Sequence, residues 1–129
     1  MEINKPETLT ELTAAFEQYQ QALDANDPDY LNQFFWKSPQ TVRYGVAENL
    51  YGYDDIGSYR RNRAKVGGAP ERKVSRSVIT TFGRDFGTTN IDFVRTKTGT
   101  RGRQSQVWMR TSEGWRIVSA HVSLIRDAD

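Results

Sequence analysis

The chain lacks cysteine, has a single histidine, His121, and contains only four prolines in 129 residues. The absence of cysteine excludes disulfides, thiolate nucleophiles and cysteine-bound metals. One imidazole alone leaves too few ligands for a transition-metal site. No run approaches the ~18 consecutive apolar residues of a membrane-spanning helix, and no signal-like segment opens the chain. We therefore expect a cytoplasmic protein without a transition-metal site, whose chemistry depends largely on Tyr, Arg, Asp and Glu.

Arginine dominates the positive charge of this chain. The sequence has 13 Arg against 5 Lys, while 16 acidic residues hold the net charge to +2. A planar guanidinium binds carboxylates in a bidentate manner, whereas the lysine ammonium is a hydrated point charge. The basic residues are spread along the chain rather than clustered with aromatics, which disfavours nucleic acid. We therefore expect a small acidic ligand, with neither nucleic acid nor a membrane as partner.

Helical patterns occupy the first part of a chain whose length indicates one domain, residues 1–129. Apolar residues at three- and four-residue spacing predict a first helix, with a buried face of Leu9, Leu12, Phe16, Tyr19 and Leu23. A capping box of Thr8 and Glu11 is expected to start this helix. Asp27 is expected to cap a second helix that has Pro28 at its first position. The expected buried side of the second helix is Leu31, Phe34 and Phe35.

Strand patterns occupy most of the remainder. Thr41–Tyr44 is expected as a short strand, and a third helix is expected from Asp54 or Asp55 through Ala64. Alternation and β-branched residues predict four long strands at Arg72–Phe82, Phe86–Lys97, Gly102–Arg110 and Trp115–Leu124. Helices followed by antiparallel strands indicate an α+β fold, in which three helices cover one face of a curved sheet.

The most informative stretch runs from Trp36 to Tyr53, W-K-S-P-Q-T-V-R-Y-G-V-A-E-N-L-Y-G-Y, and contains one arginine, Arg43. By strand alternation Arg43 lies on the face opposite Tyr44. If that face is solvated, Arg43 is an ordinary surface cation. If it faces the pocket, Arg43 needs a carboxylate, from Glu48 or from a ligand, because an unpaired buried guanidinium is costly.

Two further side chains have competing interpretations. Tyr19 lies on the apolar side of the first helix, so it is either a core aromatic or a phenol whose pKa a neighbouring guanidinium lowers. Such a Tyr–Arg pair would serve as an acid/base or nucleophilic couple. By alternation His121 shares a face with Trp115 and Ile117, so it is either a hydrogen-bonded core residue or an acid/base that lines the cavity.

The remaining candidates lie around this motif. Arg103 would bind a second carboxylate or lie in an interface. Asn49, in the expected loop after the Arg43 strand, would bind a urea carbonyl or make a turn. The expected third helix carries three arginines, which should form a largely solvated row: Arg60, Arg61 and Arg63. One of them is expected to turn inward, and the sequence does not indicate which one. The convex sheet face needs cover, and a second subunit, in a homodimer or higher oligomer, is expected over Val107, Trp108 and Ile117.

The order of elements resembles the cone-shaped nuclear transport factor 2-like fold, which implies a conical pocket between the helices and the curved sheet. The ending G-W-R-I-V-S-A-H-V-S, residues 114–123, is similar to the last strand of many members of that superfamily. Nearly the whole chain resembles the AtzH-like family, which includes the oxalurate catabolism protein HpxZ. The matching segments are Phe34–Trp36, Thr41–Gly52 (T-V-R-Y-G-V-A-E-N-L-Y-G), Gly102–Trp108 and Trp115–Ser123.

The resemblance implies a cofactor-independent, decarboxylating amidohydrolase that acts on a small ureido or carboxy-urea acid in purine, s-triazine or other nitrogen catabolism. The implied substrate is 1,3-dicarboxyurea or an oxalurate-related compound. Tyr19 and Arg43 match the family's two catalytic positions. The predicted substrate-binding residues are Trp36, Tyr44, Glu48, Asn49, Arg103 and His121.

Two other functions fit the same sequence. One is a non-catalytic module that binds an oxalurate-like anion or a partner amidase, since fold does not fix function. The other is an isomerase or dehydratase of a kind that the same cone-shaped fold supports. That chemistry needs a carboxylate in the pocket, and Asp92 is the candidate in mid-strand.

Overall fold

The computed structural model describes residues 1–126, as three helices and one six-stranded sheet. The helices are α1 (Pro6–Asp24), α2 (Pro28–Asn32) and α3 (Tyr53–Ala64). The strands are β1 (Val42–Tyr44), β2 (Asn49–Tyr51), β3 (Arg72–Phe82), β4 (Phe86–Arg95), β5 (Arg101–Thr111) and β6 (Gly114–Leu124).

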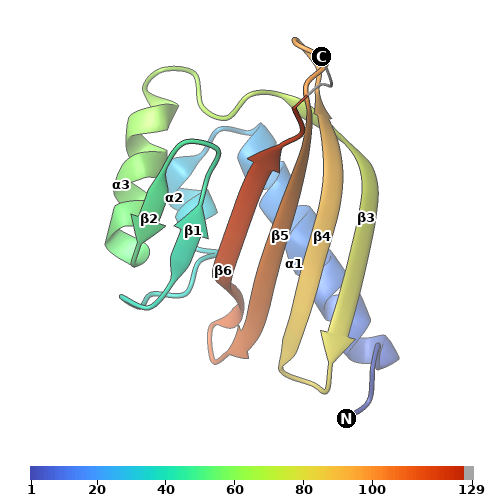
Figure 1. The fold of residues 1–129 in the computed structure, drawn as a ribbon. Coiled ribbons are helices and arrows are strands. Elements are labelled where there is room, and N and C mark those ends of the chain that lie inside the picture. Colours follow the sequence, from blue (N-terminus) through green and yellow to red (C-terminus); the bar gives the residue numbers. More distant parts are fainter. Residues whose placement is uncertain (127–129) are drawn as a thin grey trace.

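The sheet has the order β2-β1-β6-β5-β4-β3, and β1 pairs with β6 in parallel while all other neighbours are antiparallel. The helices lie on one side of this curved sheet, with α1 running behind the long strands (Figure 1). The α+β prediction is therefore confirmed, and the long strands have nearly the expected bounds. None of the described helices is both long and apolar enough to cross a membrane.

The first helix begins earlier than the predicted capping box. It starts at Pro6, and its N-cap Lys5 makes no side-chain capping bond. Proline suits the first helical position, because it has no N–H to leave unpaired there. Thr8 is consequently buried in the first turn, and its predicted capping role is wrong. The second cap is confirmed, since the Tyr30 backbone N–H donates to Asp27 Oδ1 at 3.0 Å.

The segment after the Arg43 strand is a hairpin rather than a loop. Asn49–Tyr51 forms β2 against β1, and the Gly45 N–H donates to the Glu48 carbonyl at 2.8 Å to close the turn. A side chain at Gly45 would overlap the Glu48 carboxylate and approach Arg43 Nη1 at 3.0 Å. Glycine at this position therefore lets Glu48 fold back over β1.

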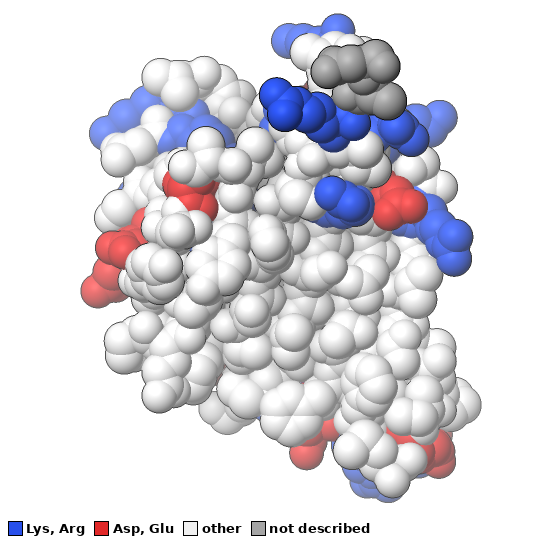
Figure 2. Space-filling model, viewed as in Figure 1, with Lys and Arg blue, Asp and Glu red and all other residues white. Residues whose placement is uncertain are grey.

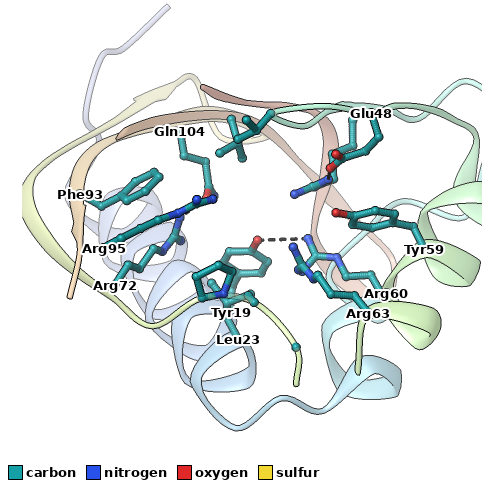
Figure 3. Close-up of a pocket in the computed structure, with 16 residues that line it drawn as sticks. Tyr19, Leu23, Glu48, Tyr59, Arg60, Arg63, Arg72, Phe93, Arg95 and Gln104 are labelled. Atoms are coloured by element: carbon teal, nitrogen blue, oxygen red, sulfur yellow. Dashed lines mark hydrogen bonds and ion pairs between the residues drawn. The ribbon is translucent and has the colours of Figure 1, made fainter. Parts of the chain in front are cut away.

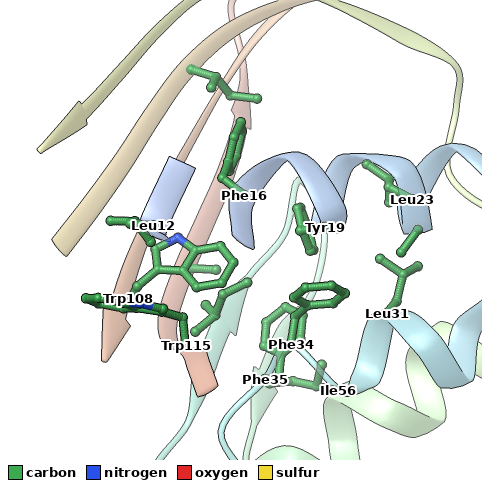
Figure 4. Packing of buried hydrophobic residues seen from close by; sticks show 14 of the residues in the cluster. Leu12, Phe16, Tyr19, Leu23, Leu31, Phe34, Phe35, Ile56, Trp108 and Trp115 are labelled. Carbon is green, nitrogen blue, oxygen red and sulfur yellow. The ribbon is translucent and has the colours of Figure 1, made fainter. Parts of the chain in front are cut away.

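The core fills the space between α1 and the concave face of the sheet (Figure 4). Trp108 and Ile117 are fully buried there, so their expected place on an outer, subunit-covered face is wrong. Val107 does face outward and is 39% exposed. The difference follows from alternation along β5, in which even-numbered residues such as Trp108 point inward and odd-numbered residues such as Val107 point outward.

A bulge in β6 changes which residues face the core. Val107 pairs with Ser119 and Trp108 pairs with Ile117, so Val118 has no partner on β5. An extra residue reverses the alternation beyond it. His121 therefore lies exposed on the outer face, with its ring 5.6 Å from that of Tyr44. Both positions predicted for His121, in the core and in the cavity, are wrong for this reason.

Candidate functional site

A cavity of about 330 Å³ opens at the end of the sheet where β4 and β6 finish and β3 and β5 begin. The second half of α1, the β1–β2 hairpin, α3 and the loop before β3 close it from the other sides. Figure 3 shows arginine side chains approaching the space from opposite walls, with Tyr19 below them. The charged and phenolic lining residues are Tyr19, Arg43, Glu48, Tyr59, Arg60, Arg63, Arg72 and Arg95.

Arg43 points into this cavity, as strand alternation allows. It is 6% exposed, and its Nη1 lies 2.9 Å from Glu48 Oε1. Its guanidinium also lies 5.5 Å from the centre of the Tyr59 ring. Burial acts to raise the pKa of Glu48, but the hydrogen bond and the charge of Arg43 hold that pKa below its ordinary value. Arg43 is therefore already paired with an internal carboxylate.

Tyr19 lies under the cavity and pairs with Arg60. Its ring is buried against aromatic neighbours, with Phe34 at 5.9 Å and Trp108 at 6.4 Å between ring centres. Its hydroxyl oxygen accepts a hydrogen bond from Arg60 Nη2 at 3.3 Å. That bond does not use the hydroxyl proton, which stays available for transfer to or from a ligand.

Three arginines determine the acidity of Tyr19. Burial acts to raise the pKa of its phenol, but the charges of Arg60, Arg72 and Arg43, together with the bond from Arg60, lower it to about 8. A phenol with such a pKa is partly ionised near neutral pH, as general-base chemistry requires. The two interpretations of Tyr19 therefore coexist, because it is a core aromatic whose hydroxyl reaches the cavity.

The opposite wall is built around Arg72. Its Nη1 donates to Gln104 Oε1 at 2.7 Å, and its Nη2 donates to Gln20 Oε1 at 2.6 Å. The guanidinium stacks over the Phe93 ring at 4.8 Å. These contacts fix its orientation, so the wall presents a positioned cation.

Arg60 and Arg72 are site residues that the sequence did not single out. Arg60 is 2% exposed and Arg63 is half-buried, and both line the cavity, while Arg61 is exposed. Helix 3 has so few apolar residues that its pattern shows no buried side. A usable signal was the spacing of Arg60 four residues after the buried Ile56, which places both on one face of the helix.

Most of the predicted substrate-binding residues lie elsewhere. Of those six, the structure brings only Glu48 together with Tyr19 and Arg43 at the cavity. Trp36 lies half-buried in a separate depression near the β5–β6 turn. The others are exposed side chains outside the cavity, namely Tyr44, Asn49, Arg103 and His121.

Arg103 lies on the outer face because β5 places its even-numbered residues inward, so Gln104 takes the cavity position. The prediction that Arg103 binds a second carboxylate in the pocket is therefore wrong. Asp92 is likewise exposed outside the cavity. Among the described lining residues Glu48 is the one carboxylate, and Arg43 holds it. The arrangement therefore does not favour the isomerase hypothesis.

The cavity carries a strong positive charge. Five arginines face one carboxylate, so four positive charges are in excess before Tyr19 ionises. Lys and Arg also gather along the rim at this end of the molecule (Figure 2). Such a field concentrates anions at the entrance. Across residues 1–126 no cluster of three or more His, Cys, Asp or Glu side chains is placed to hold a metal ion.

Comparisons with known proteins agree with this architecture. The AtzH-like family profile matches residues 1–128. A solved protein of unknown function from Pectobacterium atrosepticum is 44% identical, with a TM-score of 0.90 over 96% of this chain and 95% of that one. A cystatin-like fold protein from Burkholderia xenovorans is also 44% identical, with a TM-score of 0.91 over 99% of both chains.

A nuclear transport factor 2-like superfamily protein from Salmonella enterica serovar Typhimurium is 25% identical, with a TM-score of 0.74 over 95% of this chain and 94% of that one. No functionally curated protein matches the chain significantly. The expected cone-shaped fold is thereby confirmed. The chain belongs to the AtzH-like family, within the nuclear transport factor 2-like superfamily.

Proposed function

We propose that the cavity binds a small ureido or carboxy-urea acid and hydrolyses its C–N bond without a cofactor. The observation that carries this proposal is the buried phenol of Tyr19 beneath five converging arginines. The positive charge matches a carboxylate-bearing substrate. The volume of about 330 Å³ suits a molecule of a few heavy atoms with some water. The family resemblance supplies the substrate class, such as 1,3-dicarboxyurea or an oxalurate-related compound, and a cytoplasmic setting.

In the proposed reaction Arg43 contacts the substrate's carboxylate and Tyr19 acts at the amide carbon. As a phenolate, Tyr19 takes a proton from water, whose oxygen bonds to that carbon. The C–N bond breaks, and the leaving nitrogen takes the proton back from Tyr19. A carbamate product then loses carbon dioxide, which makes the reaction effectively irreversible. The alternative in which Tyr19 itself attacks the carbon uses the same lowered pKa.

The test is a hydrolysis assay with purified wild-type protein on carboxy-ureas, allophanate and oxalurate. We expect saturable release of ammonia and carbon dioxide from at least one of them. Saturable binding without any turnover would instead favour a second function, an accessory module that holds an oxalurate-like anion. The arginine-lined cavity supports this second function equally, because binding of an anion needs the arginines and does not need the phenolate.

We also propose that the outer sheet face forms a homodimer. Figure 2 shows that the middle of this face carries no charged side chains. Exposed apolar residues lie on it, including Val107, 39% exposed, and Tyr44, also 39% exposed. Sedimentation equilibrium should give twice the chain mass for wild type. Val107→Glu should shift the protein to monomers. Gln18→Glu, at an exposed position of α1, should leave the dimer intact. A monomeric wild type would contradict the proposal.

A further inference from the structure

Three side chains that line the cavity carry buried hydrogen-bond donors that no described residue satisfies. They are Arg60 Nε and Nη1, Arg72 Nε and Gln104 Nε2, and all three side chains line the cavity. Buried donors in folded proteins are nearly always paired, and an unpaired guanidinium held out of water is costly. These donors therefore mark a place where a group rich in acceptors belongs.

The contacts around these side chains orient them and still leave those donors free. Arg60 stacks at 5.2 Å over the Phe35 ring and uses only Nη2 for Tyr19. Arg72 donates Nη1 to Gln104 Oε1, which fixes the amide so that its NH₂ group remains as a donor. Figure 3 shows Arg60 on one wall and Arg72 with Gln104 on the other, with Tyr19 below. The side chains that carry these donors are thus held in fixed orientations on opposite walls of the cavity.

Arg43 differs from this group. Its Nη1 lies 2.9 Å from Glu48, and Gly45 leaves room for that carboxylate. A ligand carboxylate at Arg43 must share the guanidinium with Glu48 or displace it. A carboxylate beside Arg60 meets no such competitor among the described residues.

We propose that Arg60, Arg72 and Gln104 form a second carboxylate-binding subsite beside the Tyr19 hydroxyl, separate from Arg43. The inference rests on the proposed function only in placing the ligand in the same cavity. A ligand that uses both positions carries two acceptor-rich ends, as a small dicarboxylate does. Arg60 keeps Nη1 free to donate to a carboxylate oxygen while its Nη2 donates to Tyr19, and a hydrogen bond between two charged groups is strong.

The test is isothermal titration of the full chain with malonate, a small dicarboxylate. We expect wild type to bind it and Arg60→Gln to bind it about 10- to 100-fold more weakly, as for loss of a charged hydrogen-bond pair. Arg61→Gln is the matched control, because Arg61 is an exposed arginine on the same helix, and its affinity should equal that of wild type. Unfolding curves establish that each variant is folded.

Should Arg60→Gln fail to fold, Arg60→Lys keeps the charge but loses the planar guanidinium that donates to Tyr19 and to the ligand from separate nitrogens, and about a tenfold loss is expected. A spectroscopic readout separates binding from mere structural support. Malonate in the subsite puts negative charge beside Tyr19, so saturation should move the tyrosinate titration of wild type to higher pH.

No malonate binding by wild type, or equal affinity in the Arg60 variants, would overturn the subsite. Binding that Arg60→Gln loses, without any hydrolysis in the substrate panel, would retain the subsite and reject the hydrolase.

Discussion

Replacing Tyr19 with phenylalanine is expected to lower kcat for the hydrolysed ureido acid by about 10²- to 10⁴-fold, the usual contribution of a general acid or base. The phenyl ring keeps the contacts with Phe34 and Trp108, so the cavity should retain its shape. Arg60 loses its hydroxyl partner but remains in place over Phe35. KM should therefore change much less than kcat, as steady-state kinetics on both proteins will show.

The pH profile gives this prediction a second, independent readout. The phenol of Tyr19 has a pKa of about 8, below its ordinary value of 10. The phenolate fraction of the free protein therefore grows as pH rises through 8, and wild-type kcat/KM, which reports the free enzyme, should rise with it and level off above. The residual activity of Tyr19→Phe should lack that step. Full turnover in the phenylalanine variant on every accepted substrate would reject Tyr19 as the catalytic group.

Replacing Trp108 with alanine is expected to lower the free energy of unfolding by about 3–5 kcal/mol, as for other large-to-small changes in cores. Trp108 is fully buried, and its indole N–H donates to Thr89 Oγ1 at 3.0 Å. The substitution leaves a cavity and a hydroxyl without its donor. Its ring also packs edge-on against Tyr19 and Phe34, so the variant should lose activity as well as stability.

Urea unfolding of Trp108→Ala beside Ser112→Ala measures this effect. Ser112 is exposed in the turn between β5 and β6, so its removal should change the free energy of unfolding by less than about 0.5 kcal/mol. Equal midpoints for the two variants would show that the indole is not part of the core.

Local patterns were sufficient to predict most of the fold. The spacing of Leu12, Phe16 and Tyr19 predicted the buried side of α1, and alternation predicted the four long strands with small errors at their ends. Alternation also placed Arg43 on the face opposite Tyr44, and the structure shows that this is the face toward the cavity. These features depend on neighbours in the sequence, which is why the sequence alone reveals them.

The site depends on contacts that local patterns do not contain. Arg60 reaches Tyr19 across 41 positions of sequence, and Arg72 reaches Gln20 across 52. Alternation separated the two faces of β5 correctly but did not say which one is concave, so Arg103 was assigned to the wrong side. Buried arginines are rare, and a row of three on one helix therefore indicates a solvated surface.

The unpaired Val118 affects how related sequences should be aligned. A strand that lacked this residue would show the same inward-facing side chains, Ala120 and Val122, in unbroken alternation after Ile117. A one-residue gap between relatives therefore belongs at this position, and shifting it toward His121 would equate side chains from opposite faces. A bulge also bends its strand and increases the local twist. Since β6 pairs with β1 directly after the bulge, the bend lies next to the strand that carries Arg43.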